Sequence, residues 1–257
     1  MWQRLRKGIE RDGPFILLIR QLEKLLRPLG ISPMSFTSKA GFRENVRCAD
    51  MKEQFDSIAR ENLWRSRESL SGLGSELAMT AVYRAELVSF LNRRQMKTMF
   101  DAPCGDFNWM PAVLARTNVG YIGGDIAPTL IERNRRMFPQ HEFIEFDITR
   151  DDFPAADLWQ CRDCLFHLSD ELIWATLANF VRSKCEYALL TTYKGVLRNV
   201  DIEPGGWRYL DLTKRPFRLP RPEAMLRDYR IGRDFPRYLG LWHRKAVEAA
   251  LAAVGRG

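Results

Sequence analysis

The stretch Thr98-Met99-Phe100-Asp101-Ala102-Pro103-Cys104-Gly105-Asp106-Phe107 decides the fold class of this 257-residue chain. A short apolar run ends at an aspartate, and a turn with one proline and one glycine follows it directly. Further along the chain, similar short apolar segments alternate with segments in which apolar residues recur at helical spacing. Such alternation predicts an α/β fold with a doubly wound, mostly parallel sheet.

Seven strands and the helices between them follow from this pattern. We expect the strands at residues 98–101, 121–125, 143–147, 156–161, 187–192, 226–231 and 237–243. We expect helices at 107–116, 128–138 and 170–183, preceded by a helix at 51–66 and by another that ends near Leu91. A polar segment at 194–222, which contains Pro and Gly, is interpreted as an insertion after the fifth strand.

Residues 1–50 are expected to form a basic helical leader and linker, an N-terminal helical extension ahead of a domain at 51–257. Residues 1–40 contain eight basic and three acidic side chains, while the whole chain has a net charge of +8. Apolar residues recur at nearly helical spacing over 2–29, with a break at Gly13-Pro14. Basic helices with an apolar stripe are typical of membrane surfaces, so residues 1–30 are predicted to make peripheral membrane contact. Such a stripe more often packs on its own domain or on a second subunit.

The cysteines and the hydropathy of the sequence indicate the cellular compartment in which the protein is expected. The five cysteines are an odd, scattered set, which indicates reduced thiols in the cytosol rather than a disulfide framework: Cys48, Cys104, Cys161, Cys164 and Cys185. No segment approaches the roughly 18 apolar residues that a membrane-spanning helix needs. We therefore expect a cytoplasmic protein. The pair at 161 and 164 lacks the second pair that a structural zinc site needs, so no metal site is expected.

Three aspartates close three successive predicted strands, and they predict a nucleotide site. Asp101, Asp125 and Asp147 meet at one edge of a parallel sheet, where ligands bind in this class of fold. The second acid, about 20 residues beyond the turn, stands where a carboxylate accepts hydrogen bonds from a ribose. Any one of these aspartates also suits a helix cap or a closed turn.

The turn after the first strand distinguishes between nucleotide cofactors. It carries two carboxylates, Asp101 and Asp106, and a single glycine, Gly105. Carboxylates repel the pyrophosphate that a glycine-rich dinucleotide loop binds through its backbone N–H groups. They suit the ammonium and the sulfonium of S-adenosylmethionine (SAM) instead. The electrostatics favour SAM over a dinucleotide.

These segments resemble the motifs of class I SAM-dependent methyltransferases. Residues 100–110 resemble motif I, with Pro103 and Phe107 where the family often has glycine, while 121–126 and 146–148 resemble motifs II and III. The resemblance implies a Rossmann-like methyltransferase fold that binds SAM. It implies that Asp125 binds the ribose hydroxyls, Asp147 the adenine amino group, and the Ile148 N–H an adenine ring nitrogen. The expected cofactor-binding residues are Asp101, Cys104, Gly105, Asp106, Asp125, Ile126, Asp147 and Ile148.

The segment at 161–168, at the end of the fourth strand, is expected to lie beside the transferable methyl group. Methyl transfer requires an aligned acceptor and, for a hydroxyl acceptor, a base that takes its proton. Asp163 and His167 are four residues apart, so they share one face if the chain turns helical there. They are the candidate bases, with His167 preferred because its usual pKa lies closest to neutrality. A helix cap and a hydrogen-bonded histidine are the structural alternatives.

Two further segments are candidates for the acceptor side. Trp207 and Arg208 in the insertion are expected to bind substrate, since an aromatic face beside polar groups suits a sugar ring. The simpler alternative is that Trp207 anchors a long loop. Residues 64–75, with a small-residue loop, are interpreted either as a lid over the cofactor or as a plain helix connection.

The acceptor that the sequence favours is a sugar hydroxyl on a glycan or glycolipid. The pattern of 101–109 together with 161–168 resembles bacterial saccharide O-methyltransferases, among them rhizobial 2-O-methyltransferases that act on the fucose of nodulation factors. An RNA methyltransferase is an alternative because the chain is basic. A catalytically inert SAM-binding scaffold is another, since the glycine loop is a variant one. Partners are a small-molecule or saccharide acceptor, with nucleic acid not favoured and no oligomeric state predicted.

Overall fold

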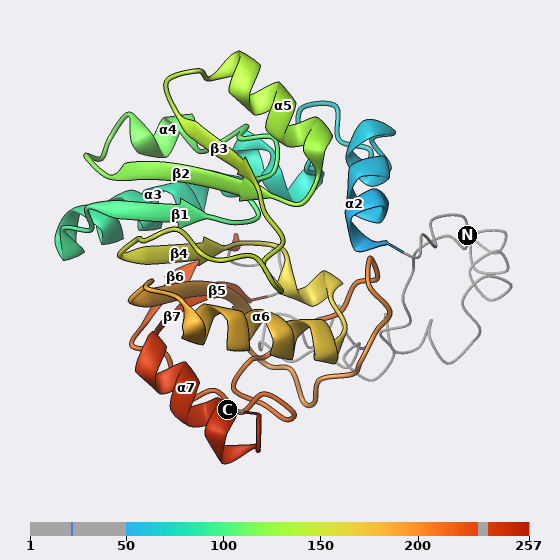
Figure 1. Cartoon of the computed structure of the whole chain (residues 1–257), viewed down its shortest axis with the longest axis vertical. Helices are drawn as coiled ribbons and strands as arrows, with labels where there is room; N and C mark the ends of the chain where they lie inside the picture. Colours follow the sequence, from blue (N-terminus) through green and yellow to red (C-terminus); the bar gives the residue numbers. More distant parts are fainter. Residues whose placement is uncertain (1–21, 23–49, 231–235, 257) are drawn as a thin grey trace, which may run out of the picture.

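The computed structural model describes residue 22 and residues 50–230 and 236–256. The predicted basic leader lies almost entirely outside the described residues. The described chain forms a seven-stranded sheet in the order β3-β2-β1-β4-β5-β7-β6 (Figure 1). The strands are β1 (Thr98–Asp101), β2 (Gly120–Asp125), β3 (Glu142–Glu145), β4 (Leu158–Cys161), β5 (Tyr187–Tyr193), β6 (Ala224–Arg227) and β7 (Arg237–His243).

The first five strands run parallel, and β7 is antiparallel to both of its neighbours, β5 and β6. The predicted seven-stranded, mostly parallel, doubly wound sheet is confirmed. The chain moves outward from β1 to β2 and β3, then returns to place β4 on the other side of β1. This reversal opens a crevice at the carboxyl ends of the strands, which is where an open α/β sheet binds ligands.

Helices cover both faces of the sheet (Figure 1). On one face, α3 (Leu77–Arg94), α4 (Pro111–Leu114) and α5 (Pro128–Met137) contribute to a core with the side chains of Met99, Leu158 and Leu189. On the other face, α6 (Asp170–Arg182) and α7 (Arg244–Ala253) pack on a second core around Trp159. A separate helix, α2 (Met51–Arg60), lies against α5, outside the sheet layers. Among the described residues, no helix combines the length and apolar character that crossing a bilayer requires.

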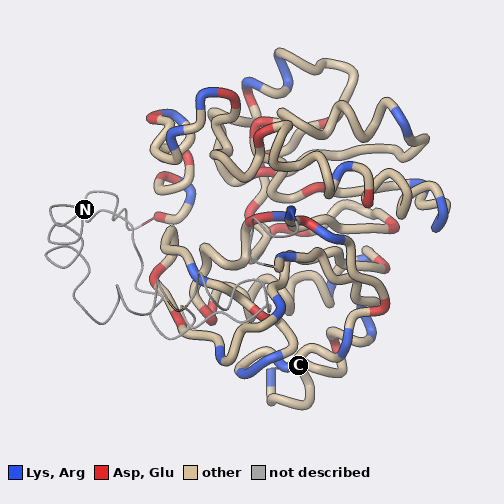
Figure 2. The backbone as a smooth tube through the Cα atoms, turned by 180° about the vertical axis from the view of Figure 1, so that it is seen from behind, with Lys and Arg blue, Asp and Glu red and all other residues tan. Residues whose placement is uncertain are grey.

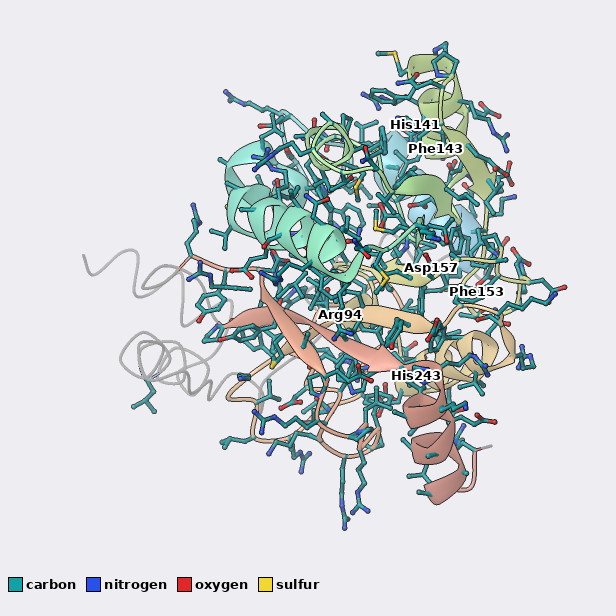
Figure 3. All side chains as sticks on the ribbon, turned by 90° about the vertical axis from the view of Figure 1, so that its left-hand side faces the viewer. Arg94, His141, Phe143, Phe153, Asp157 and His243 are labelled. Carbon is teal, nitrogen blue, oxygen red and sulfur yellow. The ribbon has the colours of Figure 1, made fainter. Side chains whose placement is uncertain are left out.

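Local sequence explains where several helices begin. Ser169 caps α6, because its side chain accepts a hydrogen bond from the Leu172 N–H, and Asp170 and Glu171 complement the positive end of the helix dipole. Proline at the first position starts α5, where a missing N–H costs nothing. His243, labelled beside α7 in Figure 3, accepts a hydrogen bond from the Lys245 N–H at 3.1 Å.

Contacts between the strand beginnings fix the register of the sheet. Asp157, labelled beside β4 in Figure 3, accepts hydrogen bonds from the backbone N–H groups of Lys97 and Thr98 at 2.7 and 3.0 Å. The Thr98 hydroxyl accepts one from the Asp157 N–H in return, at 2.9 Å. The start of β1 is thereby held against the start of β4, and the two strands end together at the crevice.

Several element boundaries differ from those expected. The helix expected at 107–116 is reduced to α4, because Phe107 has a positive φ of 58° and Pro111 begins the helical turn. The helix expected at 51–66 ends at Arg60, and positive φ angles follow at Asn62 and Arg65. The strand expected at 226–231 is β6, which begins two residues earlier, at Ala224, and ends at Arg227. The last helix, α7, was not predicted.

Candidate active site

A cavity of about 380 Å³ lies at the carboxyl ends of the central strands. Its walls come from the ends of β1 and β2, from the segments that follow β1, β2, β3 and β4, and from α2, residues 64–75, the insertion and β7. Ten of the twelve residues expected at a site line this cavity: Asp101, Cys104, Gly105, Asp125, Ile126, Asp147, Ile148, Asp163, His167 and Trp207. The fold therefore brings most of the residues singled out in the sequence to one place.

Asp125, at the end of β2, lies at one end of the cavity. Its Oδ1 accepts a hydrogen bond from the Ala127 N–H at 3.0 Å, and its Oδ2 accepts one from the Gly105 N–H at 2.9 Å. Burial raises the pKa of this carboxyl group to about 6, although these backbone hydrogen bonds oppose the increase. The carboxylate thus links the turn after β1 to the turn after β2.

Asp147 lies on the same side of the cavity, two residues beyond the end of β3, so the expectation that it closes this strand is wrong. Its Oδ1 accepts hydrogen bonds from the backbone N–H and the hydroxyl of Thr149, and Arg150 Nε lies 3.1 Å from its Oδ2. Ile148 follows it in the cavity wall. Phe146 N–H pairs with Asp125 O, which keeps this segment beside β2 after the strand itself has ended.

Asp101 ends β1 and is 2% exposed. Its Oδ2 accepts a hydrogen bond from the Tyr121 hydroxyl at 3.0 Å, and its Oδ1 accepts one from Gln160 Nε2 at 2.7 Å. Burial raises its pKa to about 7, because removal from water disfavours the charged form more than these hydrogen bonds favour it. A positive charge brought into the cavity would favour the ionised form of this group.

Asp106 does not line the cavity, which corrects the expectation that its carboxylate faces the cofactor. The side chain is 3% exposed. Its oxygens accept hydrogen bonds from Ser69 Oγ, Ser71 Oγ and the Leu70 N–H. These three donors satisfy the carboxylate, so its charge holds a neighbouring segment rather than facing the cavity.

His167 closes η5 (Leu165–His167), a short 3₁₀ helix at the other end of the cavity. Its Nδ1 lies 2.6 Å from the carbonyl oxygen of Gly206, and its ring stacks on Trp64 with 5.8 Å between ring centroids. A carbonyl oxygen only accepts hydrogen bonds, so Nδ1 carries the proton and Nε2 carries the lone pair in the neutral ring. Burial lowers the pKa of His167.

Asp163 also lines this end of the cavity, but it precedes η5 and has a positive φ of 54°. The expectation that it shares a helix face with His167 is therefore wrong. Its Oδ2 accepts a hydrogen bond from Arg237 Nη1 at 2.9 Å and lies 3.3 Å from Arg162 Nη1. Two guanidinium groups thus hold this carboxylate as an ion pair.

The two arginines form a buried charge cluster that sequence analysis missed. Arg162 Nε and Arg237 Nε each lie 3.0 Å from Oδ2 of Asp228, a fully buried side chain. Arg162 also lies over the rings of Tyr83 and Trp109. The two positive charges match those of Asp163 and Asp228, so the cluster brings no net charge to this end of the cavity. Arg162 adjoins a predicted site residue, but nothing in the sequence pairs it with Asp228, the residue that follows β6.

The two insertion residues expected to bind substrate have different positions. Trp207 lines the cavity, is 36% exposed, and contacts the rings of Phe166 and Tyr209. Arg208 is fully buried and does not line the cavity, which corrects the expectation of an acceptor contact. Its guanidinium donates hydrogen bonds to Asp170 Oδ1 and to the carbonyl oxygens of Leu168 and Val200.

Apolar side chains from α2 complete the wall beside Asp125 and Asp147, and they too were missed. Met51, Phe55 and Ala59 line the cavity from this helix. The helix is held near the site because the Thr129 N–H donates to Asp56 Oδ1 at 2.8 Å. The apolar spacing of 51–60 was a usable signal, but it did not show which surface the helix covers. No cluster of His, Cys, Asp or Glu side chains suited to a metal ion occurs within the described part of the chain.

No family model matches the chain, and no curated protein matches it in sequence. Solved structures resemble its fold. The magnesium protoporphyrin IX methyltransferase of Synechocystis PCC 6803, solved with bound SAM, has a TM-score of 0.52 and 12% identity over 77% of this chain and 98% of that chain. The 1,6-didemethyltoxoflavin-N1-methyltransferase of Burkholderia thailandensis has a TM-score of 0.52 and 12% identity over 77% and 92% of the respective chains. The chain has the Rossmann-like fold of SAM-dependent methyltransferases.

Proposed function

We propose that the protein is a SAM-dependent methyltransferase that methylates a hydroxyl group, with a sugar as the acceptor. The observation that carries this proposal is a single cavity with buried strand-end carboxylates at one end and the lone pair of a neutral histidine at the other. Its volume of about 380 Å³ is within the usual range for small-molecule sites. The similar structures of Synechocystis and Burkholderia methyltransferases, one with bound SAM and one with S-adenosylhomocysteine (SAH), support this choice of cofactor.

The residues present fit SAM. Asp125 would accept hydrogen bonds from the ribose, Asp147 and Ile148 would bind the adenine edge, and Met51 and Phe55 would cover its ring. Asp101 would pair with the ammonium group. Burial raises the pKa of Asp101 to about 7, which supports this assignment, because a bound cation offsets the cost of charging the carboxyl group. When bound, SAM supplies a methyl group attached to a good leaving group.

His167 is proposed as the base that takes the proton from the acceptor hydroxyl. Its Nδ1–H is held by the Gly206 carbonyl, so Nε2 is the basic atom, and the lowered pKa keeps the ring neutral and ready to accept a proton. Stacking on Trp64 fixes the plane of the ring. Asp163, the second candidate, is engaged by two guanidinium groups and is proposed to orient the acceptor rather than deprotonate it.

A glycan or glycolipid sugar suits the acceptor end of the cavity. Trp64 and Trp207 offer aromatic faces, and the charge cluster around Asp163 is balanced, so an uncharged ring with hydroxyl groups fits. The resemblance to saccharide O-methyltransferases, including those that modify the fucose of nodulation factors, supports this class. RNA is less favoured, because basic and acidic residues are interspersed over the described backbone in Figure 2 rather than collected on one face.

The proposal is tested by SAH calorimetry and by transfer of labelled methyl groups from SAM to extracted saccharides, lipids and RNA. The wild-type protein should bind SAH, and Asp125→Ala should weaken binding at least about tenfold through loss of charged hydrogen bonds. His167→Gln should reduce methyl transfer by about 10²–10⁴-fold with little change in SAH affinity, because only proton transfer is lost. The control is His243→Gln, which removes a histidine at the start of α7, away from the cavity.

Each outcome separates the alternatives. If the labelled methyl group appears only in RNA, the acceptor is RNA and not a sugar. If the protein binds SAH but transfers no methyl group to any extract, the result favours a catalytically inert SAM-binding scaffold. If His167→Gln transfers methyl groups at the wild-type rate, His167 is not the base. No SAH binding by the wild-type protein would reject the methyltransferase proposal itself.

A further inference from the structure

Residues 66–75, called the cover segment here, lie across the turn that follows β1. Residues Ser71 to Ser75 of this segment line the cavity. A Cβ atom on Gly105 would overlap Ser71 Oγ, and one on Gly74 would come within 2.7 Å of Asp163 Oδ2. The cover segment therefore touches the turn after β1 and also the turn after β4, and at each contact a side chain lies against a glycine.

Asp106 is the centre of the attachment. Its Oδ1 accepts hydrogen bonds from Ser69 Oγ at 2.9 Å and Ser71 Oγ at 3.2 Å, and its Oδ2 accepts one from the Leu70 N–H at 2.8 Å. Its own N–H donates to Ser71 Oγ at 2.8 Å. Four hydrogen bonds thus join one residue of the cofactor turn to three consecutive residues of the cover segment. Hydrogen bonds to a carboxylate are about twice as strong as neutral ones.

The end of the cover segment is held by other polar contacts. Asn108 Nδ2 donates to the Ser75 carbonyl at 3.0 Å, and Arg162 Nη2 donates to the Gly74 carbonyl at 2.9 Å. Apolar packing in the segment is limited: Leu70 is partly buried against Ala59, Ala127 and Leu130, while Leu73 is 58% exposed. A segment that is held largely by hydrogen bonds and buries little apolar area opens locally at low cost when those bonds are removed.

We propose that Asp106 is a positioning residue that holds the cover segment closed over the bound cofactor, and that this attachment sets the rate at which the cofactor product leaves. The inference rests on the proposed function, because it takes the cavity as the SAM site. It assigns to Asp106 a role in retaining the cofactor without contacting it. The charge acts through Ser69, Leu70 and Ser71 on the part of the segment that covers the cavity.

Stopped-flow binding of SAH to the full chain tests this role, with the fluorescence of the cavity tryptophans Trp64, Trp109 and Trp207 as the signal. In Asp106→Asn the SAH dissociation rate should rise at least about tenfold while the association rate changes little, since the carboxylate bonds stabilise only the closed segment. Hydrogen exchange at the Leu70 amide, which donates to Asp106, should accelerate while the β4 and β5 amides stay protected.

Asp211→Asn is the matched control. Asp211 is 7% exposed and likewise accepts hydrogen bonds from a backbone N–H and a hydroxyl, both of Thr213, but it does not line the cavity. This variant should release SAH at the wild-type rate. Ser69→Ala removes one donor and keeps the carboxylate, so it should accelerate release by a smaller factor even if Asp106→Asn fails to fold.

Two results would overturn the inference. One is an SAH dissociation rate equal to that of the wild-type protein in a folded Asp106→Asn variant, or in Ser69→Ala if the first variant does not fold. The other is equal acceleration in Asp211→Asn, which would indicate general destabilisation. Failure of the wild-type protein to bind SAH is a different outcome, because it contradicts the proposed function as a whole.

Discussion

Asp101 and Asp125 hold protons at higher pH than ordinary aspartates, with pKa values of about 7 and about 6, because both are buried. A carboxyl group whose pKa is higher in the folded than in the unfolded chain binds more protons in the folded state over the interval between the two values. For these two groups the interval runs from about pH 4 to about pH 7. Their contribution to the stability of the cofactor-free protein therefore decreases as the pH rises through this interval.

Cofactor binding should show the opposite trend with pH. If the ammonium group of SAH pairs with ionised Asp101, as proposed, affinity should be about tenfold higher near pH 8 than near pH 6, with proton release near pH 7. Calorimetry in two buffers of different ionisation enthalpy measures both quantities. Asp101→Asn should flatten the profile. A wild-type affinity independent of pH would show that this carboxyl group does not respond to the cofactor.

The insertion after β5 is joined to the His167 end of the cavity by several hydrogen bonds. The Gly205 N–H donates to the His167 carbonyl at 2.8 Å, and Gly206 accepts from the His167 ring. The Arg208 N–H donates to the Phe166 carbonyl, and the Arg208 guanidinium donates to the Leu168 carbonyl. The insertion thus positions η5, and the buried Arg208 side chain is part of this connection.

Arg208→Met should lower the free energy of unfolding by about 2–4 kcal/mol, because it leaves buried carbonyl groups and Asp170 without their partner. Asp170 is partly exposed and regains water, which keeps the loss toward the lower end of this range. Urea unfolding measures the change, and SAH affinity should stay at the wild-type value. If the variant keeps the wild-type stability but loses methyl transfer, the result would instead support the expectation from the sequence that Arg208 contacts the acceptor.

At the level of the whole chain, the basic leader remains a prediction. Residues 1–30 are proposed to bring the protein to an anionic membrane surface, where a lipid-linked saccharide would be accessible. The full chain should float with anionic liposomes and a version lacking residues 1–30 should not, since each basic residue near such a surface contributes about 1 kcal/mol. Neutral liposomes are the control. Equal flotation of the two versions with anionic vesicles would contradict the membrane proposal.

The alternation of strands and helices, and with it the sheet, was predictable because it depends on local apolar patterns. The carboxyl ends of parallel strands share one edge, so the strand-end residues Asp101 and Asp125 and the segment containing Asp147 were expected to gather there, and all three line the cavity. His167 was found in the same way, because it follows the end of β4 closely along the chain. The sheet and the position of these residues depend only on the order of strands and helices along the chain, which can be predicted from the sequence.

The partners of charged residues were not predictable from local patterns. Asp106 pairs with residues 35 to 37 positions away, Arg208 with Asp170 at 38, and Asp163 with Arg237 at 74. A carboxylate in the cofactor turn is equally suited to a ligand cation or to neighbouring N–H and hydroxyl donors. Which of these it meets depends on how residues 66–75, the insertion and β7 pack around the crevice. Burial and long-range contact, set when the chain is fully folded, decide whether each charge faces the cavity or supports its wall.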